Sequence, residues 1–346
     1  MVIINGGYLA AGGQILRTAT ALAAIKKIPC HIFAIRKGRP NPGLATQHLL
    51  GLQTLSRLCN GRLEGDFLGS TEIKFYPGEI TKEKISLSIP TAASVTLILQ
   101  SLIPPALFAP EPIKISFDGG ATDTFFSPSI DHFRYIFLKI LEKITQNEKC
   151  SRSVEVNIIK RGYYPEGGAK VEVKIFPSRL KPINFIERGK LEKILVISGA
   201  SSALKDKKVS ERQLIGMREI LKKLKLPIEE RVEYYDTKSP GSQICIICEF
   251  QNSIIGVDNL GKLGKPAESI GREAALELLR EEKTKACLDR HLADQVLPYM
   301  TLAQQESQVT VSDLTLHAKT NIWTIEKFIP GKFEVKGNLI KWIPKH

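Results

Sequence analysis

One histidine near the end of the chain, His317, has neighbours that could support chemistry on a phosphate group. It lies in the run 316–322 among small and polar residues, and Ile322, Ile325 and Phe328 follow with the spacing of a buried helix face. The backbone N–H groups at the start of a helix favour phosphate. The pattern therefore suggests a histidine beside an anion site, where it could take part in catalysis. A structural or surface histidine is the alternative.

The loop 35–44 is a candidate phosphate clamp. Three cations, Arg36 and Arg39 among them, surround a glycine, and two prolines stiffen the chain before a helix that begins near Gln47. Arginine offers planar paired donors to phosphate oxygens, which lysine cannot do. We expect phosphate binding here, with an exposed basic turn as the alternative.

Three further segments contain residues that could contact a ligand. The segment 12–17, Gly-Gly-Gln-Ile-Leu-Arg, is expected at a strand-to-helix turn, where glycines let the backbone approach a ligand. The segment 161–168 joins two strands and offers aromatics and a cation for nucleic acid, or is simply a glycine-rich hairpin. The segment 291–295, His-Leu-Ala-Asp-Gln, would by itself be a solvated helix face.

The composition is that of a basic globular protein. The 346 residues are 43% hydrophobic and 25% charged, with a formal net charge of +13 and a pI near 9.4. This excess favours polyanionic partners, unless it is only a lysine-rich surface. No apolar run is long enough for a transmembrane helix, and the amino end lacks the features of a signal peptide. Cys245 and Cys248 would point to opposite faces of a strand, so we expect buried free thiols and a cytoplasmic protein.

The elements that must position these residues recur in three rounds. The first comprises a helix over 14–25, a strand over 30–35, a helix over 44–59, and strands near 62 and over 72–76. The second comprises a strand over 85–89, a helix over 91–102, a strand over 113–117, a helix over 129–145, and strands over 154–160 and 170–176. The third comprises a helix over 267–282, a strand over 308–311, a helix after 319, and strands over 333–335 and 339–342.

We therefore predict an α/β (α+β) fold of three repeated units, each with helices packed on a small four-stranded sheet. Between the second and third rounds, a stretch does not follow this order of elements. It is expected to contain a strand over 193–198, a helix over 210–224, and strands over 229–235, 243–250 and 253–257. The predicted division is a large domain of residues 1–182 and 263–346 and a smaller inserted α/β domain of residues 183–262.

Taken together, the segments resemble the RNA 3'-terminal phosphate cyclase family, in the family's order and across nearly the whole chain. The matching segments are 12–17, 35–44 with Gln47-His48-Leu49, 161–168, 291–295 and 317–322. The resemblance implies the three-unit fold with an insert, ATP as co-substrate, Mg²⁺ or Mn²⁺, and an RNA with a 3'-terminal phosphate as partner. It implies no membrane partner and leaves the oligomeric state open.

By this resemblance His317 would attack the α-phosphorus of ATP and hold AMP. The adenylyl group would pass to the RNA 3'-phosphate, and the adjacent 2'-hydroxyl would then close a 2',3'-cyclic phosphate. The implied phosphate and RNA contacts are Arg17, Arg36, Arg39 and Gln47, and the implied ATP contacts are Gln100, His291, Leu292, Ala293, Asp294 and Gln295. A neutral imidazole suits the nucleophilic role, and cations suit the charge that gathers around the phosphorus.

The chain departs from the family at Ala10-Ala11, where the family usually has Glu followed by Gly. That glutamate is expected to help bind the metal, so the metal ligand is left unassigned and activity could be reduced. The residues 90–93 also differ from the family's glycine-rich helix opening. One alternative is a weakened or inactive cyclase-like RNA-binding protein of RNA processing or ribosome assembly. Another is a small-molecule transferase built from similar repeated units.

Overall fold

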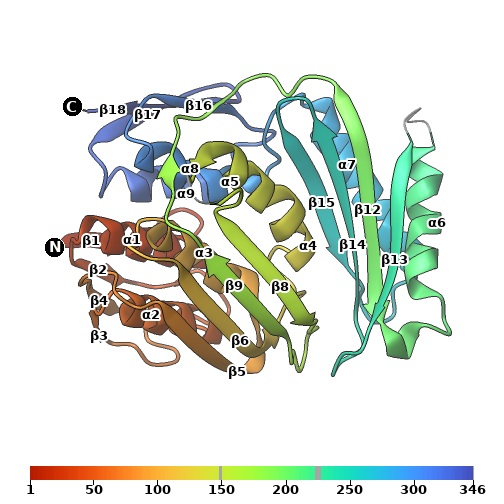
Figure 1. The fold of residues 1–346 in the computed structure, drawn as a ribbon, viewed down its shortest axis with the longest axis horizontal. Helices are drawn as coiled ribbons and strands as arrows, with labels where there is room; N and C mark the ends of the chain where they lie inside the picture. The colour runs from red at the N-terminus through yellow and green to blue at the C-terminus, as the bar shows by residue number, and fades with distance from the viewer. Residues whose placement is uncertain (148–149, 223–226, 346) are drawn as a thin grey trace.

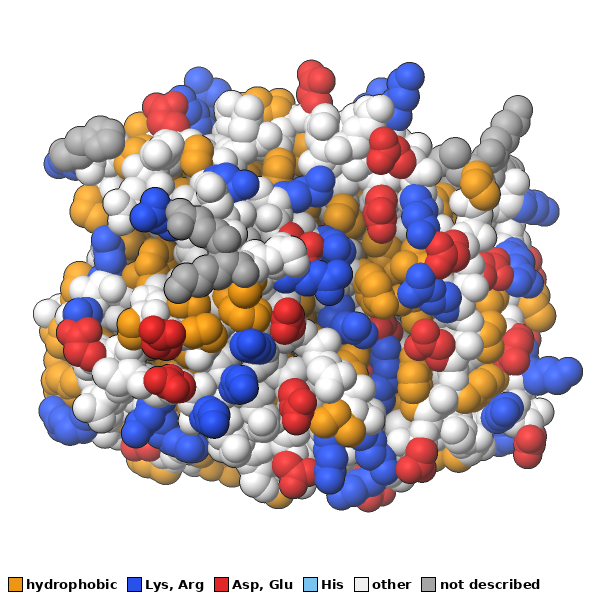
Figure 2. Space-filling view, viewed as in Figure 1, with side chains coloured by type: hydrophobic (Ala, Val, Ile, Leu, Met, Phe, Trp, Pro, Cys, Tyr) orange, Lys and Arg blue, Asp and Glu red, His pale blue; other side chains and the backbone are white. Residues whose placement is uncertain are grey.

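The structure is a computed structural model that describes residues 1–147, 150–222 and 227–345. Three units, each with helices packed against a four-stranded sheet, form one body, and a further four-stranded sheet stands beside it (Figure 1). The helices α6 (Val209–Leu221) and α7 (Ala267–Lys283) cover the far side of that further sheet. In the same view, basic and acidic side chains lie next to one another over this part of the molecule (Figure 2). The predicted α/β class with three repeats and an inserted α/β segment is confirmed.

The units follow one order of elements, with a split third unit. The first contains β1 (Val2–Asn5), α1 (Gly13–Lys26), β2 (Cys30–Phe33), α2 (Thr46–Leu58), β3 (Arg62–Glu64) and β4 (Ile73–Tyr76). The second contains β5 (Lys84–Ser94), α3 (Val95–Ala106), β6 (Ile113–Ala121), α4 (Ile130–His132), a π-helical turn (Phe133–Phe137), α5 (Leu138–Ile144), β8 (Val154–Lys160) and β9 (Lys170–Ile175). The third contains β11 (Asn184–Phe185), α8 (Leu292–Leu302), β16 (Ser307–Thr310), α9 (Leu316–Ile325), β17 (Gly331–Lys336) and β18 (Leu339–Pro344).

Strand pairing proves the repeat, because each unit places its strands in the same spatial order. The orders are β1-β2-β4-β3, β5-β6-β9-β8 and β11-β16-β18-β17. In each, the first two strands pair in parallel and the other two pairings are antiparallel. The short strands β7 (Thr145–Gln146) and β10 (Arg179–Leu180) form a separate antiparallel pair.

Local sequence explains why these elements form. In β5, buried and exposed residues alternate up to Ile89, the pattern of a strand with one face on a core. Hydroxyl side chains accept backbone N–H groups at three helix starts: Ser94 for α3, Ser129 for α4 and Thr315 for α9. The cap at Thr315 fixes where the helix containing His317 begins.

The third unit is interrupted between β11 and α8 by the inserted elements. These are β12 (Leu191–Ser201), a 3-10 turn (Ser202–Leu204), α6 (Val209–Leu221), β13 (Ile228–Tyr235), β14 (Ser242–Phe250), β15 (Ile254–Leu260) and α7 (Ala267–Lys283). The sheet has the order β13-β12-β14-β15. The predicted helix over 210–224 extends to residues 223 and 224, which lie outside the described residues.

Two parts of the predicted organisation differ from the structure. The helix α7, expected in the third unit, packs instead on α6, β14 and β15 of the inserted segment. Strand β11, expected in the insert, pairs with β16 of the third unit. An amphipathic helix fits any apolar sheet face, so its periodicity alone could not identify the sheet that α7 covers. The predicted domain boundaries themselves stay a prediction.

Two predicted boundaries in the second unit were also wrong. Residues 91–94 were expected to open a helix, but β5 continues through Ser94 and the helix starts at Val95. The strand predicted over 113–117 was expected to end there, but β6 continues to Ala121. Both strands continue because β5 and β6 pair with each other, with an irregular register between Ile89 and Ser94.

The core has two parts that meet at the inserted sheet. Strand β14 contributes Cys245 to the large core of the repeats and Cys248 to the smaller core under α6 and α7. The two thiols are free, buried and on opposite faces, as predicted. No helix in the described part of the chain has the length and apolar character needed to cross a membrane.

Candidate active site

His317 occupies the first turn of α9, two residues after the capping Thr315. The Thr315 hydroxyl accepts the Ala318 N–H at 3.1 Å, which leaves the preceding N–H groups of the helix start available to an anion. The residue is exposed, and α9 packs against α1 and α8. The expected position at a helix start is confirmed.

The surroundings of His317 favour its neutral form. Partial burial lowers the pKa of its imidazole below the ordinary 6.5, and the charges of Arg17, Arg39 and His291 lower that pKa further. These three residues come from α1, the loop after β2 and the start of α8, yet all lie near enough to act on one ring. The structure thus brings together four predicted site residues from both ends of the chain.

Arg17 extends from α1, and its guanidinium is largely buried. Burial lowers the pKa of its guanidinium to about 10, while the carboxyl group of Asp294 acts in the opposite direction. The group still bears its charge at neutral pH. A desolvated cation attracts an anion more strongly than an exposed one does, because less water screens it.

The basic loop after β2 is held in a fixed shape. Arg36 has φ 54°, and its Nη1 donates to the Gly43 carbonyl at 2.7 Å, so the side chain closes the loop on itself. Burial and the nearby charge of Arg39 lower the pKa of Arg36. Arg39 is exposed, and its Nη2 would lie 3.3 Å from a Cβ added at Gly12. The loop thus presents Arg39 to the turn before α1.

His48, for which the sequence predicted no role, lies near the guanidinium groups of Arg17 and Arg36. The Nε2 atom of His48 would lie 2.1 Å from a Cβ added at Gly13, so only glycine fits at position 13. The Nδ1 atom of His48 accepts the Ala45 N–H at 3.2 Å. Burial, together with Arg17 and Arg36, lowers its pKa to about 3. A second histidine one turn into a helix behind a basic loop was the available signal. Gln47, half-buried beside it, has no hydrogen bond to the other site residues within the described chain.

A small cavity of about 30 Å³ lies between α1, α3, α8 and α9. Its lining includes Gln14, Arg17, Gln100, Asp294, Gln295 and Asn321. Gln100 Nε2 donates to Gln295 Oε1 at 2.9 Å, and Gln295 Nε2 donates to the His291 carbonyl at 2.9 Å. The Nε2 of Gln14 is buried without a hydrogen-bond partner among the described residues. The cavity has room for one or two waters, so adenosine would need these side chains to move.

The segment 291–295 is divided between cavity and core. Asp294 and Gln295 line the cavity, and burial raises the pKa of Asp294 to about 6 against the opposing effect of Arg17. Leu292 and Ala293 are completely buried in the hydrophobic core. Their side chains therefore point away from the cavity, because consecutive helix residues point in different directions, and their part in binding ATP stays a prediction.

The turn at Ala10 and Ala11 contributes no metal ligand. The Ala10 N–H donates to Thr320 Oγ1 of α9 at 3.3 Å, and Ala11 has φ 44°, a conformation that favours glycine. Across residues 1–147, 150–222 and 227–345, no group of three or more His, Cys, Asp or Glu side chains is arranged to hold a metal. A divalent ion held by one or two carboxylates together with the phosphates of a substrate does not require such a group.

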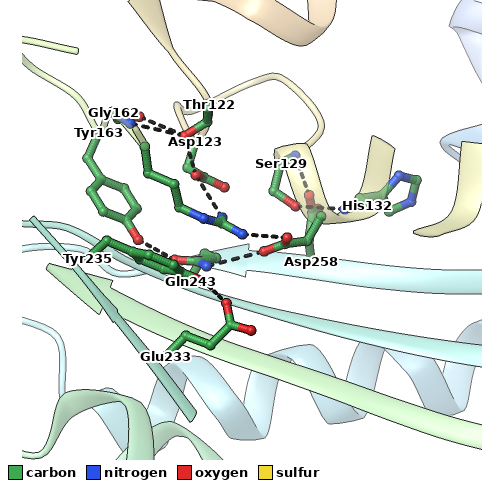
Figure 3. Close-up of polar contacts among 12 residues, drawn as sticks. Thr122, Asp123, Ser129, His132, Gly162, Tyr163, Glu233, Tyr235, Gln243 and Asp258 are labelled. Carbon is green, nitrogen blue, oxygen red and sulfur yellow. Dashed lines mark hydrogen bonds and ion pairs between the residues drawn. The ribbon is translucent and has the colours of Figure 1, made fainter. Parts of the chain in front are cut away.

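The hairpin 161–168 serves mainly as structure (Figure 3). Arg161 is buried, with its guanidinium 3.2 Å from Asp123, 2.5 Å from Asp131 and 4.4 Å from the centre of the Tyr235 ring. Tyr163 donates to Gln243 of the inserted sheet, whose amide in turn donates to Asp131 at 3.2 Å. The expectation that this cation is offered to nucleic acid is therefore wrong; its partners lie 30 to 38 residues away in the sequence.

Comparison with known proteins gives a consistent result. The family model described as "RNA 3'-terminal phosphate cyclase" matches residues 8–335. The RNA 3'-terminal phosphate cyclase of Pyrococcus furiosus is 41% identical over 345 residues, covering 98% of this chain and 96% of its own. The RNA 3'-terminal phosphate cyclase of Sulfolobus acidocaldarius is 41% identical over 340 residues, covering 98% of both chains. That of Thermococcus kodakarensis is 40% identical over 342 residues, covering 98% of this chain and 96% of its own. With the repeat topology and the convergence on His317, these matches establish that the chain belongs to the RNA 3'-terminal phosphate cyclase family.

Proposed function

We propose that the protein converts an RNA 3'-terminal phosphate to a 2',3'-cyclic phosphate at the expense of ATP, with His317 as the nucleophile. The observation that supports this most is the grouping of a partly buried His317 with Arg17, Arg39 and His291, because burial and then these charges lower its pKa. A neutral imidazole has a lone pair for attack, and the same cations would attract a triphosphate.

In the first step, a ring nitrogen of His317 would attack the α-phosphorus of ATP. The new nitrogen–phosphorus bond replaces the bond to the β-phosphate oxygen, and pyrophosphate leaves. Arg17 and Arg39 would offset the charge on the transferred phosphate, and Arg36 would hold the loop in shape through Gly43. The cavity side chains of Gln14, Gln100, Asp294 and Gln295 would contact the nucleoside after rearrangement.

In the second step, an oxygen of the RNA 3'-phosphate would attack the same phosphorus and release His317. The 2'-hydroxyl would then attack the activated 3'-phosphate, closing the cyclic product and releasing AMP. Because the described residues form no group of three or more metal-binding side chains, we assign no step to a divalent ion. The expected Mg²⁺ or Mn²⁺ would have to be held chiefly by the phosphates of ATP.

Labelling with ATP that has a labelled α-phosphate tests the first step directly. The intact protein should acquire label through an acid-labile, alkali-stable bond, and His317→Ala should acquire none. His132→Ala, which removes a buried histidine outside the site, is a matched control that should still label if it folds. Equal label on wild type and His317→Ala would contradict the proposed role of His317.

A weakened, chiefly RNA-binding relative is the second candidate, and Ala10 is the observation in its favour. The turn before α1 has no carboxylate at this position, although it directly contacts α9 through Thr320. That candidate predicts salt-sensitive RNA binding without conversion of a 3'-phosphorylated oligonucleotide to a phosphatase-resistant product. The cytoplasmic location, no membrane partner and an undetermined oligomeric state stay as expectations.

A further inference from the structure

Two aromatic rings stack on the surface beside the last turn of α9. The rings of Tyr8 and Trp323 have centroids 4.3 Å apart and planes inclined by 25°. Tyr8 is 37% exposed and Trp323 is partly exposed, so the pair is open to solvent. The Nζ of Lys327 lies 5.5 Å from the centre of the Trp323 ring.

The pair is held in position by the turn that leads into α1. Tyr8 lies in this turn, where its carbonyl accepts the Ala11 N–H at 2.9 Å. The Ala10 N–H then donates to Thr320 of α9 at 3.3 Å. The turn and the helix are thus joined midway between His317 and Trp323, and the stacked rings are fixed relative to His317.

Positive charges without acidic partners surround the rings. Lys319 precedes Trp323 by four residues and so shares its face of α9, and Lys327 lies in the turn just after the helix, against the Trp323 ring. Lys37 lies against the same turn, its Cβ 3.4 Å from a Cβ added at Gly7. Within the described residues Lys37, Lys319 and Lys327 form no ion pair, whereas Arg212 and Arg218 of the inserted segment each pair with a glutamate. Exposed aromatic rings among cations are the surface that single-stranded nucleic acid binds.

The stacked pair is separate from the cavity expected to receive ATP. Asn321 of α9 lines that cavity, while Trp323, two residues later, points to a different side of the helix. Trp323 follows His317 by six residues, which is about 9 Å along the helix axis and about a third of a turn around it. A polynucleotide that follows the helix surface over this distance would have a phosphate at His317 and a base at Trp323.

We propose that the stacked Tyr8–Trp323 pair, flanked by Lys319 and Lys327, is a platform for a base of single-stranded RNA near its 3'-terminal phosphate. This inference rests on the proposed function, because it assumes that the terminal phosphate lies at His317. It goes further by naming the surface that holds the RNA strand. Stacking accepts any base, so the platform would bind single strands with little sequence preference.

The fluorescence of Trp323 allows a direct test. The chain has two tryptophans, and Trp342 is completely buried, so Trp323 is the one that RNA can reach. The full-length protein is titrated with a single-stranded oligoribonucleotide ending in a 3'-phosphate, without ATP. We expect saturable quenching that Trp323→Phe abolishes and Trp342→Phe retains. Quenching by ATP alone to the same extent would overturn the proposal, since adenine would then occupy the platform.

Affinity measurements supply the second arm. Trp323→Ala should weaken binding of the oligonucleotide about 5- to 150-fold, and Trp323→Phe much less, because phenylalanine can still stack. Lys319→Ala with Lys327→Ala should reduce the slope of log affinity against log salt by about 1.4, the value for two phosphate contacts on a single strand. The exposed pair Lys205→Ala with Lys207→Ala, in the inserted segment, is the control that should leave the slope unchanged.

Clear outcomes would overturn the inference. Unchanged RNA affinity in a folded Trp323→Ala, or no quenching of the wild type while RNA binds, would exclude the platform. If Trp323→Ala does not fold, the fluorescence titration of Trp323→Phe and the salt dependence of the Lys319→Ala, Lys327→Ala variant still test the platform. Wild-type protein that takes up no label from ATP but shows the Trp323 quench would refute the proposed chemistry and leave the RNA surface standing.

Discussion

Arg17 and His317 are 300 residues apart in the sequence, yet Arg17 lies near enough to the imidazole to lower its pKa. The contact between α1 and α9 produces this proximity. Arg17 also lines the cavity between α1, α3, α8 and α9, so it links the reactive ring to the expected nucleoside site. The first and third units are thus both required for one site.

The cations around His317 should shift the pH dependence of self-adenylation. Partial burial, and then these cations, lower its pKa below 6.5, so the neutral ring persists as pH falls, and the rate declines only below that shifted pKa. Arg39→Gln removes one cation and should raise the pKa, moving the acidic limb of the pH–rate profile to higher pH. The control Lys205→Gln should leave the limb in place; an unmoved limb in Arg39→Gln would refute the coupling.

His48 should make the fold less stable in mild acid. Its pKa is about 3 in the folded chain and 6.5 ordinarily, so between those values the unfolded state binds more protons. Stability therefore falls as pH drops below about 6.5, by up to about 1.4 kcal/mol per pH unit. Denaturant melts from pH 7 to 5 should show a smaller decline for His48→Gln than for wild type. His31→Gln, at an exposed ion pair with Glu72, should decline as the wild type does.

Ala11→Gly should stabilise the protein. Alanine at φ 44° is strained, and glycine relieves the strain although its unfolded chain is more flexible. We expect a gain of up to about 1 kcal/mol, measured as a higher midpoint of denaturant unfolding. The same change at Ala24, inside α1, should instead lower the midpoint, because that backbone is helical. A loss at position 11 would contradict the strain.

Ala10→Glu should raise the rate of self-adenylation several-fold in Mg²⁺ or Mn²⁺. The carboxylate would restore an oxygen ligand in the turn that contacts α9 through Thr320. Ala10→Gln has nearly the same shape without the charge and is the matched control. A metal titration of both variants measures the effect, and equal rates in Glu, Gln and wild type would mean that this position does not bind the ion.

Arg161→Ala should destabilise the fold by about 3–5 kcal/mol, because it leaves the buried carboxyl groups of Asp123 and Asp131 without their cation. Arg218→Ala breaks an exposed pair with Glu230 and should cost less than about 1 kcal/mol. Urea unfolding measures both. A small loss in Arg161→Ala would mean that the acids find other partners.

The sequence predicted the repeat and a helix start near His317 because both depend on local patterns. Apolar spacing is a property of neighbouring residues, although it placed the start of this helix after 319, whereas the helix begins at Leu316, behind the cap at Thr315. The place of α7 could not be predicted, since its apolar face fits either of two sheets. Local spacing carries no information about which sheet a helix covers.

Because local sequence does not show which distant residues a side chain meets, it also could not predict the different roles of two arginines. Arg17 and Arg161 both stand in glycine-containing motifs, and both were considered as binding cations. Arg161 is neutralised by Asp123 and Asp131, whereas Arg17 faces Asp294 and a cavity. The deciding partners come from distant segments, so only the tertiary structure separates a structural cation from one available to a ligand.

The split third unit has a consequence for how the protein is made. Strand β11 pairs with β16, although paired residues in the two strands are 124 residues apart in the sequence. Strand β18, which ends at Pro344, lies inside the same sheet and not at its edge. The sheet of the unit containing His317 therefore closes only after β18 has been synthesised. A fragment that stops before Leu339 would lack the strand that joins β16 to β17, and α9 would have no complete sheet beneath it.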